Sequence, residues 1–196
     1  MTKGADTRQR ILDNAFRLAA RDGLGGVSLG TLADDIGLSK SGLFAHFRSK
    51  EELQLEMLRT ASMQFVENVM VPALRKPRGV PRLRAMFDNW LAWASTQQGG
   101  CIFVTASVEL DDRPGRVRDY VAQQQQALMD AIARAAEISK TEGHFRKDLD
   151  VEQFAFEMEA IYLVFHHAHR LLRDPKAAKR ARAAFNRLIQ TAAAPV

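Results

Sequence analysis

The stretch SLGTLADDIGLSKSGLFAHFRSK, residues 28–50, decides the fold of the chain. Its first half has apolar residues at the i, i+3, i+4 and i+7 positions of one helical face: Leu29, Leu32, Ala33 and Ile36. Ser28 is a suitable N-cap for this helix, and Gly37 suits the left-handed residue that ends it. Ser39 can cap a second, short helix from residue 40 to about 47. Two helices joined by a short turn that contains glycine predict a helix-turn-helix, in which the second helix enters a DNA major groove.

The same residues resemble the DNA-binding segment of the TetR family of bacterial regulators. The resemblance rests on the run SKSGLFAHF at 39–47, followed by SKEEL at 49–53. It implies that the start of the second helix, Lys40, Ser41 and Gly42, faces base edges, where a lysine can reach guanine O6 or N7. It also implies that four residues hold phosphates: Ser28, Ser39, His46 and Lys50. For His46 the alternative is a packed or capping side chain.

The resemblance is imperfect at two positions of the second helix. Phe44 and Ala45 stand where family members commonly carry two tyrosines. Phe44 keeps the aromatic ring without the hydroxyl, so it can still make an apolar contact with a thymine methyl group or a sugar. We therefore expect the base preference of this chain to differ from that of its relatives.

Length and composition are those of an ordinary globular protein. The 196 residues carry a net charge of +5, and residues 1–50 hold eight Lys/Arg against five Asp/Glu. A small basic domain beside a nearly neutral body fits contact with phosphates through the first part only. No apolar run approaches the roughly 18 residues of a membrane span. The N-terminal segment lacks an apolar signal core, and the one cysteine excludes an internal disulfide, so we expect a cytoplasmic protein.

Helical periodicity continues through the whole chain and predicts an all-α fold of about nine helices. The expected helices outside the helix-turn-helix are 6–22, 49–71, 81–96, 101–110, 114–140, 151–172 and one after Pro175. Ser49 and Glu52 form a capping box at the start of the helix 49–71, which would link the two parts of the chain. We therefore expect a DNA-binding domain at 1–48 and a helical ligand-binding and dimerisation domain at 49–196.

The helix expected at 151–172 has two adjacent apolar stripes, which predicts burial on more than one side. We expect it to pair with the last helix and with their symmetry mates in a homodimer, as the resemblance implies, because a helix-turn-helix usually binds two half-sites. The expected interface residues are Phe165, His169, Leu172, Phe185 and Leu188. The alternative is that helices of the same chain cover this surface.

The larger domain is expected to bind a small, mostly apolar effector. The candidate lining residues are Phe87, Trp90, Trp93, Phe103, Phe154, Met158 and Tyr162, of which several must be plain core. Glu109 is a candidate for a polar contact with the ligand, with a surface or capping role as the alternative. The hypothesis is a ligand-responsive regulator, most simply a repressor, that binds a palindromic double-stranded DNA operator with two heads roughly 34–36 Å apart. It needs no cofactor.

Two other groups of residues are candidate sites. His166, His167 and His169, with Glu157 or Glu159, suggest a metal site, but the histidine spacing does not place three ligands on one face, so we expect interface or pocket histidines and no metal. Cys101 follows two glycines at an expected helix start, which leaves open a thiol sensor or a small apolar residue. No nucleophile has a partner base, so we expect no enzyme. The rival hypothesis is an all-α enzyme or carrier that uses the apolar interior and these histidines.

Overall fold

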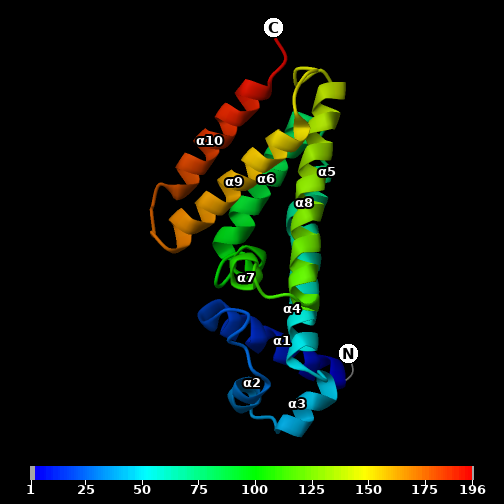
Figure 1. Ribbon diagram of the computed structural model, residues 1–196, viewed down its shortest axis with the longest axis vertical. Helices are drawn as coiled ribbons and strands as arrows, with labels where there is room; N and C mark the ends of the chain where they lie inside the picture. The colour runs from blue at the N-terminus through cyan, green and yellow to red at the C-terminus, as the bar shows by residue number, and fades with distance from the viewer. Residues whose placement is uncertain (1–2, 196) are drawn as a thin grey trace. The chain divides into compact units, whose positions relative to one another are not determined.

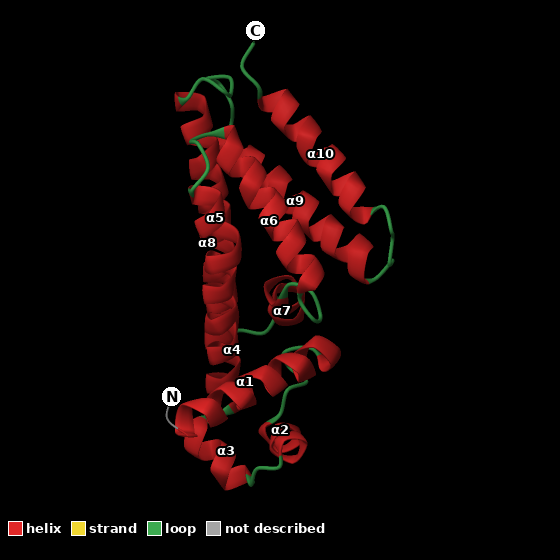
Figure 2. Cartoon of the chain, turned by 180° about the vertical axis from the view of Figure 1, so that it is seen from behind, coloured by secondary structure: helices red, strands yellow, loops and turns green. Residues whose placement is uncertain are grey.

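The computed structural model describes residues 3–195, which form helices joined by turns and loops, with an isolated bridge between Phe145 and Ala193 (Figures 1 and 2). The elements are α1 (Lys3–Asp22), α2 (Leu29–Ile36), α3 (Lys40–His46), α4 (Lys50–Phe65), the π-helical turn η1 (Val66–Met70), α5 (Val71–Leu74), α6 (Val80–Thr96), α7 (Ile102–Leu110), α8 (Arg116–Thr141), α9 (Val151–Arg170) and α10 (Ala177–Ala192). Because α4, η1 and α5 follow one another without a break, the described residues form nine helical rods. The all-α prediction is confirmed. No helix in this part of the chain is long and apolar enough to cross a membrane.

The helix boundaries of the helix-turn-helix follow from local capping. The Ser28 hydroxyl accepts a hydrogen bond from the Thr31 amide at 3.1 Å, and the Ser39 hydroxyl accepts one from the Gly42 amide at 3.0 Å. Gly37 has a φ of 68°, the left-handed conformation that a residue with a Cβ adopts only with strain. All three expected caps are therefore present.

The residues fall into two units by their contacts. One unit combines the chain up to Met63 with Gln98–Gln123, and the other combines Gln64–Gln97 with the chain from Gln124 onward. The first unit therefore includes α7 and the start of α8 as well as the helix-turn-helix. The predicted domain division at residue 48 remains a prediction.

The core of the first unit contains the apolar residues of the helix-turn-helix. Leu32, Leu43 and Phe47 are fully buried, whereas Phe16 and Ile36 are half-buried. Arg8 of α1 lies with its guanidinium 4.4 Å from the centre of the Phe47 ring, and it donates a hydrogen bond to the His46 carbonyl at 2.8 Å. These contacts fix the end of α3 against α1.

The core of the second unit is an aromatic cluster between α6, α9 and α10, which lie side by side in both views (Figures 1 and 2). Trp90 of α6 stacks on Tyr162 of α9, with ring centroids 4.2 Å apart. Phe87 of α6 stacks on Phe185 of α10 at 4.1 Å. All four rings are at most 3% exposed. The broad apolar surface of α9 is thus partly used within its own chain.

The sequence predicted that the helix beginning near Lys50 would end near Val71, but it continues to Leu74. The Val71 amide bonds to the Val66 carbonyl, five residues back, so the backbone widens into a π-turn just before Pro72. Asn89 of α6 donates its side-chain amide to the Val69 carbonyl at 3.0 Å. Proline lacks an N–H and usually breaks a helix. Here the π-turn changes the hydrogen-bond register and Asn89 supplies a further bond, so the helix continues past Pro72.

Candidate functional site

The outer face of α3 is small, and its apolar side chains are not buried against the rest of the protein. Lys40, Ser41, Phe44 and Ala45 are all exposed, and Phe44 leaves 48% of its surface accessible. Gly42 is half-buried beside the Ser39 cap, and a Cβ there would lie 3.2 Å from the Ser39 hydroxyl. The surface thus offers one cation, a hydroxyl and an aromatic ring to a ligand outside the protein.

The four residues expected to hold phosphates lie in different surroundings. Ser28 and Ser39 use their hydroxyls as helix caps. His46 is half-buried at the end of α3. Lys50, at the start of α4, is exposed, but its ammonium group donates a hydrogen bond to the Gly25 carbonyl.

The Leu24–Gly25 segment of the α1–α2 turn is held by side chains from two other helices. Glu109 of α7 accepts hydrogen bonds from the Leu24 amide, at 2.8 Å, and from the Gly25 amide. The carbonyl of Leu24 accepts a bond from Gln54 of α4 at 2.9 Å, and the carbonyl of Gly25 accepts the one from Lys50. Both amides and both carbonyls are therefore satisfied by side chains. We call this arrangement the turn clamp.

Glycines allow the close approach that the turn clamp needs. A Cβ on Gly25 would overlap Glu109 Oε1, and one on Gly23 would lie 2.9 Å from Glu109 Oε2. Gly99, before α7, has a φ of 78°, and a Cβ there would lie 2.7 Å from the Ala20 Cα. The sequence left Glu109 either a polar contact for a ligand or a surface or capping carboxylate, and it did not identify the two amides that this carboxylate binds. The only local signal was a turn with free amides, and its carboxylate partner lies 84 residues further along the chain.

The residues expected to line a ligand site are buried, and only some of them are brought together. Phe87, Trp90 and Tyr162 form one stack, with Met158 fully buried on the same helix as Tyr162. Trp93 packs edge-on against Phe65 with ring centroids 5.5 Å apart. Phe154 instead packs against Phe145, at 5.2 Å. Phe103 and Glu109 belong to the first unit.

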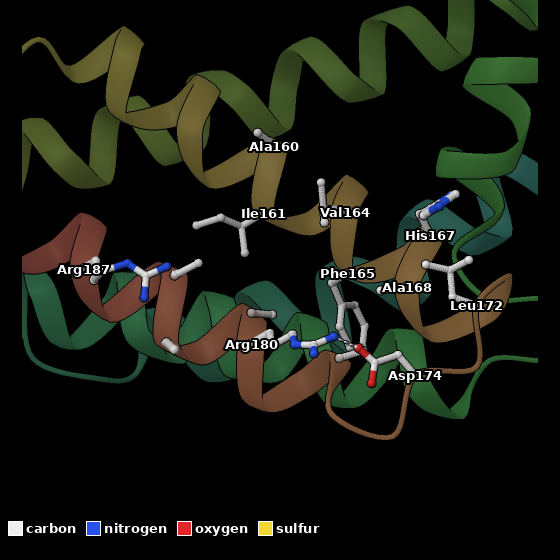
Figure 3. Close-up of a pocket in the computed structure, with 14 residues that line it drawn as sticks. Ala160, Ile161, Val164, Phe165, His167, Ala168, Leu172, Asp174, Arg180 and Arg187 are labelled. Carbon is white, nitrogen blue, oxygen red and sulfur yellow. Dashed lines mark hydrogen bonds and ion pairs between the residues drawn. The ribbon is translucent and has the colours of Figure 1, made fainter.

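A groove of about 660 Å³ runs between α9 and α10 (Figure 3). Its lining is mainly small and apolar: Ala160, Ile161, Val164, Phe165, Ala168, Leu172, Ala177, Ala181, Ala183 and Ala184. The polar residues His167, Asp174, Arg180 and Arg187 complete it, and Arg180 pairs with Asp174. Val164 and Leu172 are 66% and 61% exposed, and Leu171 beside them is 70% exposed. This groove and its rim are an apolar surface that no described residue covers.

The five residues expected at a dimer interface differ in exposure. Phe165, Phe185 and Leu188 are buried in their own chain, His169 is half-buried and Leu172 is exposed. Phe165 lies between Trp90 and His169, with ring centroids 5.7 and 5.3 Å away. Sequence periodicity could not tell which stripe of each helix is buried within its own chain and which is exposed.

The buried side of α9 also carries ionisable side chains. Burial raises the pKa of Glu159 to about 7, and burial followed by the charge of Glu159 raises the pKa of Tyr162 well above its usual value. Burial lowers the pKa of His166, assisted by Arg170 and the neighbouring histidines. Within residues 3–195, no three His, Cys, Asp or Glu side chains are grouped to hold a metal ion. Cys101 is buried at the start of α7.

Two family models match the chain. Residues 11–57 match the model of bacterial regulatory proteins of the tetR family, and residues 79–185 match the model of the tetracyclin repressor-like C-terminal domain. Among curated relatives, the transcriptional repressor AcnR of Corynebacterium efficiens is 26% identical over 167 residues, which cover 81% of this chain and 79% of AcnR. The transcriptional regulator AcrR of Shigella flexneri is 38% identical over 52 residues, which are 26% of this chain and 24% of AcrR.

Solved structures of similar fold agree with these matches. A TetR transcriptional regulator from Chloroflexus aurantiacus superposes with a TM-score of 0.84, at 24% identity, over 97% of this chain and 96% of that one. The regulator AibR, solved with isovaleryl coenzyme A and operator DNA, gives a TM-score of 0.76 at 20% identity over 96% and 99% of the chains. At these identities the likeness concerns the fold.

Proposed function

Since the chain belongs to the TetR family of bacterial regulators, we propose that it is a transcriptional repressor that binds a palindromic operator as a homodimer and is released by a small-molecule effector. The observation that carries the DNA-binding part is the surface of α3. Lys40, Ser41 and Phe44 project from a short helix whose start is fixed by the Ser39 cap, and none of them is buried in the protein. Such a helix presents its N-terminal residues to base edges when it lies in a major groove.

The proposed roles on DNA separate base contacts from phosphate contacts. Lys40 and Ser41 would contact base edges, and Phe44 would contact a thymine methyl group or a sugar. The amides at the start of α3 would support a phosphate, since helix N-termini attract anions. For Lys50, the bond to the Gly25 carbonyl supports a second role in the turn clamp beside any phosphate contact.

The apolar groove between α9 and α10 supports the homodimer. Val164, Leu171 and Leu172 would be costly to leave in water, and two copies of this surface facing each other would bury them. The proposed interface therefore centres on Val164, Ala168, Leu172 and Ala184, with Phe165 beneath it. Phe185 and Leu188 are buried in their own chain, so they would support the interface only by fixing the position of α10.

The turn clamp supports a route by which an effector changes DNA binding. Glu109 is on α7, and its carboxylate holds two amides of the turn that precedes α2. A shift of α7 would therefore move or release that turn and with it the helix-turn-helix. A coupling free energy of about 1–3 kcal/mol would weaken operator binding by roughly 5- to 150-fold.

A gel-shift titration with DNA from upstream of the gene tests this function. The full chain is expected to form a sequence-preferring complex, and raising the salt from 50 to 200 mM should weaken it by orders of magnitude, because phosphate contacts release counterions. Random DNA of the same length is the control. A complex with no sequence preference, or no complex at any protein concentration, would refute the proposal.

A further inference from the structure

The second residue of α2 is a glycine that the backbone does not require. Gly30 follows the Ser28 cap and Leu29 in the first turn of the helix, and it is not one of the described glycines with a positive φ. Glycine inside a helix destabilises it relative to alanine, because glycine has more conformational freedom to lose on folding. The conformation of α2 therefore gives no reason for a residue without a side chain at this position.

The space beside Gly30 is occupied by a lysine from the next helix. Apart from its chain neighbours and the backbone of its own helix, a Cβ on Gly30 would have two described atoms within 4 Å: Lys40 Cε and Ser28 Oγ, each at 3.8 Å. Lys40 is the first residue of α3. Its stem thus lies across the first turn of α2, in the space that a longer side chain on residue 30 would enter.

The charge of Lys40 is not neutralised within the protein. Lys40 is exposed, and no described Asp or Glu forms an ion pair with its ammonium group. Because the ammonium nitrogen is bonded directly to Cε, it lies close to the first turn of α2. The contact at Gly30 therefore holds the apolar stem of the side chain and leaves its charge free for a group outside the protein.

A lysine stem that rests on another helix is restricted in direction. A free lysine side chain has many rotamers, and holding one of them on DNA costs conformational entropy. Contact with α2 removes some of these rotamers before binding, which reduces that cost and directs the ammonium group. A larger side chain on residue 30 would occupy the space of the Lys40 stem and turn Lys40 in another direction.

We propose that Gly30 is a positioning residue for base recognition: because it lacks a side chain, Lys40 can lie across α2, and this direction determines which base edge Lys40 reads. This role rests on the proposed function, since Lys40 must contact DNA for its direction to matter. Gly30 itself makes no base contact and acts only through Lys40. The specificity of the DNA-binding surface then depends on the first turn of α2 as well as on α3.

Base discrimination, measured one operator position at a time, tests this role. The operator is the sequence that the purified full chain selects from random DNA, and fluorescence anisotropy gives the affinity for each of its single-base variants. Lys40→Ala identifies the position that Lys40 reads. Gly30→Val places a branched side chain against the Lys40 stem, so we expect it to lower discrimination at that same position about tenfold. The cation is still present, so the slope of log affinity against log salt should stay that of the wild type.

Further variants separate positioning from damage to the fold. Gly30→Ala is the matched control: its Cβ, 3.8 Å from Lys40 Cε, makes an ordinary contact, so this variant should keep wild-type discrimination. The double variant Gly30→Val with Lys40→Ala should lose no more discrimination than Lys40→Ala alone, because both changes remove the same base contact. Circular dichroism checks folding. Gly30→Met, which introduces a strong helix former, replaces Gly30→Val if valine unfolds the protein.

The possible failures of the test differ in what they refute. Full discrimination in Gly30→Val and Gly30→Met, an equal loss at every position, or additive losses in the double variant would overturn the role of Gly30 and leave the repressor supported. A Lys40→Ala variant that weakens binding to all operator variants alike would also overturn it, because Lys40 would then contact only phosphate. A wild-type chain with no sequence preference refutes both the repressor and the role of Gly30.

Discussion

At the scale of single residues, charged side chains on this chain serve different purposes according to what surrounds them. Lys40 is exposed at the start of α3 and is available to DNA. Glu159 is half-buried on α9, and one of its carboxyl oxygens is buried without a hydrogen-bond partner. Both were ordinary charges in the sequence, and only their surroundings distinguish them. Each supports a prediction.

Replacement of Lys40 by alanine should weaken DNA binding in two ways. It removes a cation near the phosphates, so the slope of log affinity against log salt should fall by about 1 per chain. It also removes a donor to a base edge, so discrimination at one position should drop by about 1–3 kcal/mol. Fluorescence anisotropy on a set of single-base operator variants measures both. Lys179→Ala, on the exposed side of α10, is the control and should change neither.

The raised pKa of Glu159 makes stability depend on pH. Because the folded protein holds this proton more tightly than the unfolded chain, the contribution of Glu159 to stability is complete below about pH 4.5 and is lost as the pH rises through about 7. Glu159→Gln removes this titration. Its free energy of unfolding relative to wild type should therefore rise by about 2–3 kcal/mol between pH 4.5 and pH 8.

Urea unfolding at fixed protein concentration measures this difference. His166 titrates in both proteins, so its effect largely cancels, and Glu157→Gln should track the wild type. A difference between Glu159→Gln and wild type that stays constant with pH would show that the carboxyl group is not held in its protonated form.

At the scale of helices, short-range signals and long-range contacts differ in how well the sequence predicts them. The caps at Ser28, Gly37 and Ser39 were predictable because each depends on residues within four positions. The passage of the helix through Pro72 was not, because it depends on Asn89 from α6. For the same reason the partners of Glu109, the Leu24 and Gly25 amides, could not be predicted. Local capping can be predicted from a sequence, whereas a hydrogen bond between residues 84 positions apart cannot.

The turn clamp predicts what happens when its carboxylate is removed. Glu109→Ala leaves the Leu24 and Gly25 amides without their acceptor, so we expect a loss of about 1–3 kcal/mol in stability. Hydrogen exchange at these two amides should accelerate, and DNA affinity should fall because the turn no longer holds α2 firmly. Asp112→Ala, in the exposed segment after α7, is the control. Unchanged exchange at Leu24 and Gly25 would contradict the clamp.

The apolar groove of α9 and α10 predicts how the oligomer can be broken. Val164→Glu places a charge on a side chain that is 66% exposed in the single chain but buried in the proposed dimer. Sedimentation should then show a monomer that still folds, with weakened operator binding. Val108→Glu changes an equally apolar, 72% exposed residue outside the groove and should remain dimeric. A Val164→Glu dimer of wild-type affinity would place the interface elsewhere.

At the scale of the whole molecule, the proposed repressor needs two copies of a weak DNA-binding surface. The seven-residue helix α3 has one lysine and no arginine, so a single head offers few base contacts. Specificity would then come from two heads whose spacing the dimer fixes and the effector changes. The all-α fold and the helix-turn-helix were foreseeable from periodicity. Which surfaces of the helical body remain free for a second chain was not, because it depends on packing among α6, α9 and α10.

Selection of operator sequences from random DNA by the purified full chain tests whether two heads bind DNA at a fixed spacing. We expect enrichment of an inverted repeat whose half-site centres are 10–10.5 base pairs or a multiple of that apart, bound by an even number of chains. Lys40→Ala should relax the same position in both halves of the repeat. Enrichment of a single unrepeated site, or of no sequence at all, would refute specific binding by a pair of heads.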